Sequence, residues 1–187
     1  MTTKDQILDA TEQLIQQRGF SGFSFQDVAD AVGIKKASIY YYYPAKGDLG
    51  SAVVARYRER MRGSFDKLDT AKREDFWPLL ETYLGPMALF GKSSGVACLS
   101  GVLGGEFLNL PPELQKEIAF FFDEHEDFFT LLLERGRRAG AFHFSVDARS
   151  VARLLFSALE GALLIKRIKR DETYFASLLE HATSLLK

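Results

Sequence analysis

Residues 19–49 read GFSGFSFQDVADAVGIKKASIYYYYPAKGDL, and this stretch decides the fold. Ser24 stands before an apolar run and is followed three residues later by Asp27, which is the pattern of a capping box at a helix N-terminus. We therefore expect a short helix over residues 24–32. Gly33 is expected to end this helix, because glycine reaches the backbone angles that a sharp reversal needs.

A second short helix is expected over residues 35–42, because Pro44 cannot continue a helix. Two short helices around a tight glycine turn form a helix-turn-helix. The second helix carries two cations, a hydroxyl and three phenols, which can contact phosphates and base edges in a major groove. These residues are Lys35, Lys36, Ser38, Tyr40, Tyr41 and Tyr42. On turn geometry alone, a helical hairpin with a solvated basic end fits the pattern equally well.

The charge of the chain is divided unevenly. The whole chain carries a formal net charge of −1, which by itself says nothing about nucleic acid. Residues 1–62 contain nine Lys/Arg and seven Asp/Glu, a net charge of +2, and the remainder carries −3. Residues 34–47 contain three lysines and no acid. This basic patch coincides with the expected helix-turn-helix, as a nucleic-acid-binding element requires.

The wider pattern over residues 6–55 resembles the signature of the TetR family of bacterial transcriptional regulators. In that signature a helix ends at Gly-aromatic and a Thr/Ser-capped helix follows. After Gly-hydrophobic comes a recognition helix with a Leu-Tyr-Tyr-His-Phe-like core, and a lysine stands at the start of the fourth helix. The phrases ERGRRAGAF at 134–142 and ALEGALL at 158–164 resemble the family's approach to its dimerisation helices.

The resemblance implies a helix-turn-helix DNA-binding domain at residues 1–46, a linking fourth helix at 45–67, and a ligand-binding and dimerisation domain at 68–187. It also implies a function. A homodimeric repressor would bind double-stranded DNA at a near-palindromic operator and be released by a small apolar or aromatic ligand, whose identity the sequence leaves unknown.

The resemblance also assigns roles to single positions. Tyr40 and Tyr41 match paired aromatics that touch the DNA backbone and bases, and Tyr42 stands where the family often has a phosphate-binding histidine. Lys46 matches a lysine that meets a phosphate at the start of the fourth helix, and Lys36 matches a common lysine of the recognition helix.

Ser24 and Gln26 match the residues of the preceding helix that lie nearest the DNA backbone. Three positions depart from the pattern. Lys35 replaces a capping Ser/Thr, Ala37 replaces a glycine, and Tyr43 replaces a core phenylalanine. The Tyr43 hydroxyl therefore needs a hydrogen-bond partner or an exit to water.

Beyond residue 63 the apolar residues recur with helical period, and no segment alternates with the period of two that is typical of a strand. The expected helices are Phe76–Phe90, interrupted near Gly85-Pro86, then Ala97–Leu110, 113–138, 147–169 and 172–186. The fold class is all-α: a three-helix N-terminal domain and a larger helical domain. The last two helices, 147–169 and 172–186, carry matching apolar stripes. The stripe residues are Val151, Leu154, Leu155, Ala158, Leu159, Ala162 and Leu163 on the first helix, and Phe175, Leu178, Leu179, Ala182 and Leu185 on the second. Packing within one chain is the simpler interpretation, and the apolar surface that it leaves uncovered predicts a homodimer through a two-fold four-helix bundle.

Aromatic residues gather in the second part of the chain, where thirteen of the sixteen phenylalanines lie beyond residue 63. Aromatic side chains at helical spacing can form a packed core, or they can line an apolar ligand cavity between helices. The sequence leaves both interpretations open. The candidate pocket residues are Phe76, Trp77, Tyr83, Phe90, Phe107, Phe121, Phe122, Phe128 and Phe129.

The single cysteine, Cys98, is expected near the start of a helix, where a thiol pKa falls and the reactive thiolate is favoured. A redox or electrophile sensor acting through Cys98 is therefore the alternative to a ligand-released repressor, and a buried structural cysteine is the simpler interpretation. One cysteine forms no intramolecular disulfide, which fits a reducing compartment.

An enzyme is not expected, because the chain lacks a phosphate-cradling glycine loop and a Ser-His-Asp pattern. His125 lies among acids in Asp-Glu-His-Glu-Asp, but adjacent helical residues point to different sides. We expect a solvated face there rather than a metal site, and no cofactor. With no signal peptide and no apolar run of about 18 residues, a cytoplasmic protein without membrane contact is expected.

Overall fold

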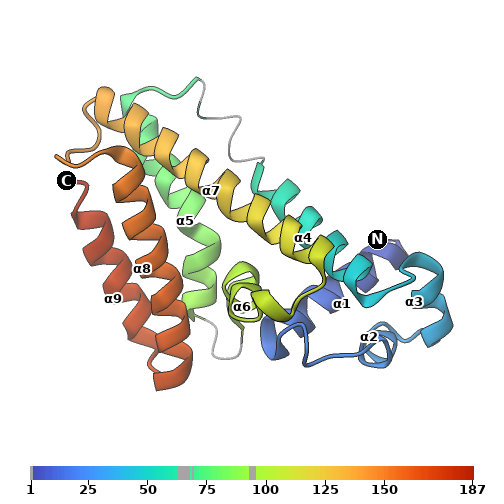
Figure 1. Ribbon diagram of the computed structural model, residues 1–187. Helices are drawn as coiled ribbons and strands as arrows, with labels where there is room; N and C mark the ends of the chain where they lie inside the picture. Colours follow the sequence, from blue (N-terminus) through green and yellow to red (C-terminus); the bar gives the residue numbers. More distant parts are fainter. Residues whose placement is uncertain (1, 63–67, 69, 93–95) are drawn as a thin grey trace. The chain divides into compact units, whose positions relative to one another are not determined.

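The computed structural model describes residues 2–62, 68, 70–92 and 96–187, and the regular structure within them is helical throughout (Figure 1). The helices are α1 (Thr3–Arg18), α2 (Phe25–Val32), α3 (Lys36–Tyr42), α4 (Lys46–Arg62), α5 (Phe76–Lys92), α6 (Leu99–Gly105), α7 (Pro112–Arg138), α8 (Ala148–Lys169) and α9 (Glu172–Ser184). Short 3-10 turns cover Arg73–Asp75 and Phe107–Asn109. The predicted all-α class is confirmed.

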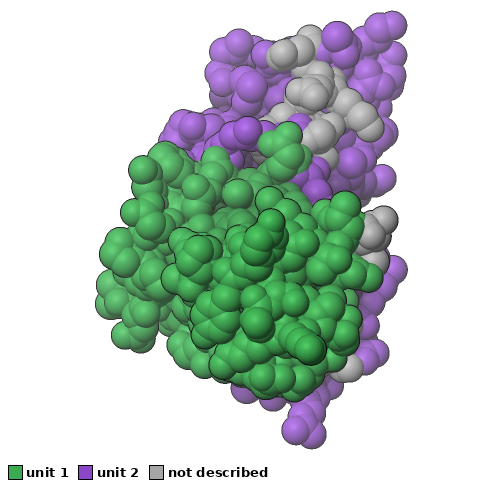
Figure 2. Space-filling model, turned by 90° about the vertical axis from the view of Figure 1, so that its right-hand side faces the viewer, with its two compact units in different colours: residues 1–59, 96–121 green, residues 60–95, 122–187 purple. Residues whose placement is uncertain are grey.

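The chain divides into two compact units, coloured separately in Figure 2. The first unit comprises residues 1–59 together with 96–121, and the second comprises 60–95 together with 122–187. The segment 96–121 thus packs with the N-terminal helices. The boundaries predicted at residues 46 and 68 concern function and stay predictions.

The capping signals of the first unit are confirmed. Ser24 accepts a bond from the Asp27 backbone N–H, and the Asp27 carboxylate accepts from the Ser24 N–H, which completes the predicted box. Gly33 adopts φ +75° at the end of α2, a conformation that L side chains rarely adopt. Lys35 stands at the N-cap of α3 and provides no side-chain bond there, as expected for a residue without an acceptor.

Two expected helix boundaries are wrong. The interruption predicted at Gly85-Pro86 is absent, because α5 runs through Pro86 without a break. Its buried face includes Leu80, Tyr83 and Leu84, and this packing outweighs the one hydrogen bond that a proline removes. The helix predicted over 97–110 is shorter, because α6 ends at the glycine pair 104–105, where helix propensity is low.

The fourth helix extends from Lys46 to Arg62, and its predicted continuation over residues 63–67 lies outside the described residues. Each unit has its own core. The first buries Ile7, Ile15, Val28, Ile39, Leu49 and Leu114, and the second buries Leu80, Phe129, Leu133, Phe142, Leu159 and Phe175. In the second unit α8 and α9 pack against one another, and α5 packs against both.

Candidate nucleic-acid interface and ligand groove

Helix α3 presents nearly all of its side chains to solvent, since only Ile39 is buried. Tyr41 is 83% exposed, Tyr40 is 49% exposed, and Lys36 is exposed beside them. Large aromatic side chains are seldom left in water, and a cluster of them marks a binding surface. The predicted contact residues of this helix are therefore accessible to a partner.

The rings of this surface are held in defined positions by neighbouring residues. Tyr40 meets the ring of Phe25 edge-on, with centroids 4.8 Å apart, and the Lys36 Nζ lies 5.9 Å from the Tyr40 centroid. Tyr41 and Tyr42 meet edge-on at 5.1 Å. Because these contacts restrict the rings before any partner binds, less conformational entropy is lost on binding.

A hollow of about 520 Å³ opens next to α3. Ser38, Tyr41 and Tyr42 line it together with Thr3 from the start of α1. It offers hydroxyl groups at the rim of an exposed helix, and hydroxyl groups are common partners of phosphate oxygens. Three of the predicted contact residues are thus brought to one concave surface.

The predicted contact residues of α2 are exposed but already hydrogen-bonded. The Ser24 hydroxyl donates to the Asp27 carboxylate at 2.6 Å as part of the cap. The Gln26 Nε2 donates to the Asp30 carboxylate at 2.7 Å. The bonds from the Ser24 side chain and backbone lower the pKa of Asp27 and keep its carboxylate charged at the positive end of the helix dipole.

Lys46 is engaged within the first unit. Its Nζ donates to the backbone oxygen of Phe23 and lies 4.7 Å and 4.2 Å from the ring centroids of Phe20 and Phe23. Burial lowers the pKa of Lys46, against the attraction of Glu106 and Asp27. An ammonium has three N–H donors, so Lys46 can bond Phe23 and a DNA phosphate at the same time. The phosphate contact stays a prediction.

Tyr43 is buried, and its hydroxyl has neither a hydrogen-bond partner among the described residues nor access to water. Only 5% of the residue is exposed, and the Oη has no hydrogen-bond partner among the described residues. Burial raises the pKa of Tyr43. A buried hydroxyl without a partner destabilises a fold by about 1–3 kcal/mol.

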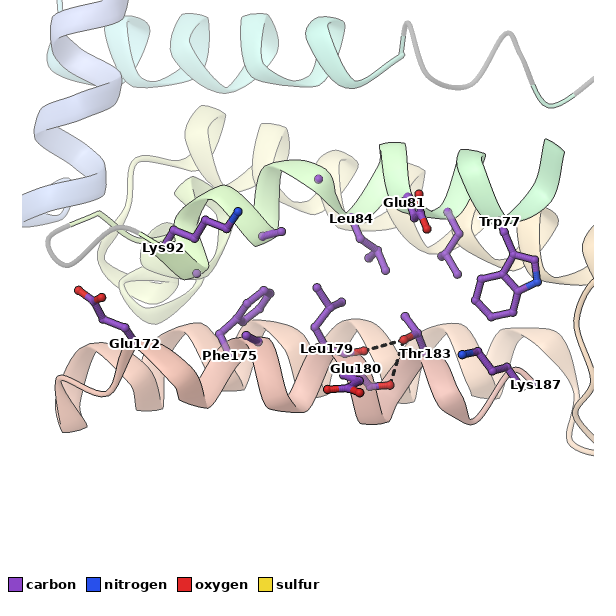
Figure 3. A pocket seen from close by; sticks show the side chains of 15 residues that line it. Trp77, Glu81, Leu84, Lys92, Glu172, Phe175, Leu179, Glu180, Thr183 and Lys187 are labelled. Carbon is purple, nitrogen blue, oxygen red and sulfur yellow. Dashed lines mark hydrogen bonds between the residues drawn. The ribbon is translucent and has the colours of Figure 1, made fainter. Parts of the chain in front are cut away.

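A groove of about 770 Å³ lies in the second unit, between α5 and α9 (Figure 3). Leu84, Phe175 and Leu179 border its middle. Trp77 and Lys187 lie at one end, where the Lys187 Nζ is 5.9 Å from the Trp77 ring, and Lys92 and Glu172 lie at the other. The volume and the apolar walls are those of a site for a small organic molecule.

Of the nine aromatic residues predicted to line a cavity, only Trp77 lines this groove. The others pack elsewhere: Phe76 on Phe142, Tyr83 on Phe128 and Phe129, Phe122 on Phe156, and, within the first unit, Phe121 on Tyr57. Phe90 and Phe107 are half-buried. The sequence does not reveal the groove residues of α9, because an apolar stripe on a helix fits a dimer contact as well as a groove wall.

The expectation for His125 is wrong. The residue is buried, with 4% exposed, and its Nδ1 lies 2.9 Å from the Tyr83 hydroxyl. Burial lowers the pKa of His125 to about 4, so the imidazole is neutral at pH 7. The neighbouring acids point elsewhere: Glu126 pairs with Arg149 and Arg153. Within the described residues no cluster of His, Cys, Asp and Glu has the form of a metal site.

Cys98 occupies the N-cap of α6 and is buried, with its Sγ 3.0 Å from the Ser100 hydroxyl. Reactive cysteines are partly exposed and lie in electropositive surroundings. Burial therefore favours the structural interpretation of Cys98. Among the helices described, none has the length and hydropathy to cross a membrane.

Comparisons with known proteins agree with these observations. A negative transcriptional regulator of a biofilm operon in Staphylococcus aureus, IcaR, is 29% identical over 147 residues, which are 70% of this chain and 78% of IcaR. The Escherichia coli repressor NemR is 23% identical over 98% of this chain and 94% of its own length.

Solved structures show the same fold. A TetR-family regulator from Agrobacterium tumefaciens has a TM-score of 0.89 at 27% identity, over 99% of this chain and 97% of that one. A TetR regulator from Legionella pneumophila has a TM-score of 0.84 at 29% identity, over 100% and 98%. The model of bacterial regulatory proteins of the tetR family matches residues 7–53, and that of the tetracyclin repressor-like C-terminal domain matches 81–182. Both matches, together with the exposed α3 surface, show that this chain is a DNA-binding transcriptional regulator of the TetR family.

Proposed function

We propose that this regulator is a homodimeric repressor that binds a near-palindromic operator and is released from it by a small apolar or aromatic ligand. The observation that carries the proposal is the exposed aromatic and basic surface of α3. The names of IcaR and NemR describe a negative regulator and a repressor, which supports repression as the direction of control.

The outer surface of α8 supports a homodimer. Of the stripe expected on this helix, Leu155, Leu159 and Leu163 are buried within the chain's own unit. Leu154 of the same stripe and two further apolar side chains, Ile165 and Ile168, remain exposed, by 62%, 37% and 73%. At about 3.6 residues per turn, Leu154, Ile165 and Ile168 lie on the same side of α8. A second copy covers such a face in an isologous four-helix contact.

The groove between α5 and α9 supports the ligand. We assign the effector to this groove, with its apolar part against Leu84, Phe175 and Leu179. A ligand releases the operator only if it binds the DNA-free form more tightly. A coupling of about 1–3 kcal/mol changes occupancy by about 5–150-fold.

Binding of a fluorescent duplex from the DNA upstream of the regulator's own coding sequence tests the DNA-binding surface. Tyr41→Ala should weaken binding at least tenfold, since aromatic and hydroxyl contacts are both lost. Phe120→Ala is the matched control, because it removes another exposed aromatic residue of the first unit. Equal affinities of these two variants would refute the assignment of the surface to α3.

Sedimentation tests the homodimer. Ile168→Glu should shift the protein toward monomer at micromolar concentration and reduce operator affinity, because both half-sites are then no longer bound together. Leu89→Glu, at an equally exposed apolar position of α5, should leave the dimer intact. A monomeric wild-type protein with full operator affinity would contradict the proposal.

A further inference from the structure

A carboxylate from outside the helix-turn-helix holds the turn between α1 and α2. Glu106, which follows α6, accepts the backbone N–H of Phe20 at 2.8 Å on one oxygen. Its other oxygen accepts the backbone N–H of Ser21 at 2.9 Å, and also the Ser21 hydroxyl. Both carboxylate oxygens are therefore used, and charge-assisted bonds of this kind are about twice as strong as neutral ones.

The turn is shaped to admit this carboxylate. Gly19 has φ +81°, and a Cβ added there would lie 2.0 Å from the Glu106 Oε1. Glycine is thus required at this position both for its backbone angle and for the approach of the carboxylate. The negative end of the α1 dipole also lies here, and it repels an acid unless specific donors compensate. The contact between Glu106 and the α1–α2 turn therefore depends on specific features of both partners.

A cation reaches the same turn from α4. The Lys46 Nζ bonds the Phe23 backbone oxygen and lies over the rings of Phe20 and Phe23. Glu106 and Lys46 attract one another. Residues 19–24 are therefore held by an acid and a base, neither of which belongs to α2 or α3.

The segment that carries Glu106 is itself anchored in the first unit. The Ala97 N–H donates to the Gln16 backbone oxygen at 3.4 Å, and α6 packs against α1 (Figure 1). Glu117 pairs with Arg58 of α4 at 2.6 Å. These contacts hold the segment 96–121 in place within the first unit. The Glu106 carboxylate therefore has a fixed position relative to the α1–α2 turn.

We propose that Glu106 is a positioning residue for operator recognition: its carboxylate fixes the α1–α2 turn and thereby sets α2 and α3 in the orientation that reads base edges. Glu106 itself does not touch DNA in this proposal. The inference rests on the proposed repressor function, since it needs an operator that the protein distinguishes from other DNA.

The test compares operator affinity with affinity for unrelated duplex of the same length. Glu106→Gln keeps the shape of the side chain but replaces one acceptor oxygen by an NH₂ group that faces a donor. Operator affinity should fall about tenfold and affinity for unrelated DNA less than twofold, because phosphate contacts tolerate misorientation and base contacts do not. Glu113→Gln, at an exposed acid of the same segment, is the control and should change neither affinity.

A double-mutant cycle adds a second readout. Ser21→Ala should lower operator affinity by a smaller factor than Glu106→Ala, and the double variant should equal Glu106→Ala, because the Ser21 hydroxyl bond needs an acceptor on the side chain of residue 106. Hydrogen exchange of the Phe20 and Ser21 amides should accelerate in Glu106→Gln while the amides of α8 keep their protection. Additive effects in the cycle would overturn the inference.

The outcomes distinguish a failure of the Glu106 positioning role from a failure of the proposed repressor function. If wild-type protein binds operator and unrelated DNA equally, the proposed function fails. The positioning role is overturned if Glu106→Gln distinguishes operator from unrelated DNA as well as the wild-type protein does. This holds when α1 is folded and the Phe20 and Ser21 amides exchange faster than in the wild-type protein. Should Glu106→Gln unfold, Glu106→Asp keeps the charge one methylene short of the turn, and it must then reduce the specificity ratio for the inference to stand.

Discussion

The Tyr83 hydroxyl lies 2.9 Å from the Nδ1 of His125, and both residues are buried in the second unit. Since burial lowers the pKa of His125 to about 4, the ring is neutral at pH 7, and its Nδ1 shares a hydrogen bond with the Tyr83 hydroxyl. His125 also stacks on Phe156, with centroids 5.9 Å apart. This pair ties α5 to α7 through the interior of the unit.

The pair predicts a loss of stability in acid. The pKa of His125 is about 4 in the folded protein and about 6.5 unfolded, so below pH 6.5 the unfolded state takes up the proton first. Stability is therefore full above pH 6.5 and falls as the pH drops toward 4, by about 3 kcal/mol in total. Urea unfolding of His125→Gln should show a weaker pH dependence over this range. His143→Gln, at an exposed imidazole, should retain the wild-type dependence.

Tyr43→Phe should stabilise the protein. The substitution removes a buried hydroxyl that has no partner among the described residues and leaves the ring packing unchanged. We expect a gain of about 1 kcal/mol in the free energy of unfolding, seen as a rise of about 2–4 °C in Tm. Tyr40→Phe, at an exposed ring, should leave Tm unchanged. A fall in Tm for Tyr43→Phe would show that the hydroxyl has a partner.

Lys46→Met tests the predicted phosphate contact. Methionine preserves apolar contact with the rings of Phe20 and Phe23 but removes the ammonium. Binding should weaken for all DNA sequences, and the salt slope should decrease by about one. Substitution of Lys36 or Tyr40 should instead change the preference among operators. A lower Tm with an unchanged salt slope would show that Lys46 stabilises the fold through Phe23 and does not contact a phosphate.

Two glycines of α5 form a matched pair. A Cβ at Gly91 would lie 2.4 Å from the Phe175 ring, whereas a Cβ at Gly85 would meet nothing within 4 Å. Gly91→Ala should therefore lower stability by about 1–3 kcal/mol. Gly85→Ala should raise stability by up to about 1 kcal/mol, because alanine favours the helix. Equal effects in thermal unfolding would show that α5 and α9 do not approach at Gly91.

The sequence predicts those parts of the fold that depend on neighbouring residues. The Ser24–Asp27 box and the Gly33 turn are local, because both partners lie within a few residues of each other. The exposed tyrosines of α3 follow from the same short pattern. Local signals of this kind are sufficient to predict the helix-turn-helix.

The features that depend on distant residues could not be predicted. His125 is buried because Tyr83 and Phe156 arrive from other helices, while its neighbours in sequence are acids. The groove depends on the spacing of α5 and α9, which no periodicity encodes. The bonds from Glu106 to Phe20 and Ser21 span about 85 positions of sequence and leave no local signal.

The packing of segment 96–121 with the N-terminal helices bears on protein engineering. A chimera that joins residues 1–59 to the body of a related regulator inherits Gly19 and Ser21 without this chain's own Glu106, which they accommodate. Leu114, which borders Gly50 and is fully buried, would also be replaced by a foreign side chain. On the proposed positioning role of Glu106, transplanting operator specificity requires two pieces of chain, residues 1–59 and 96–121, exchanged together.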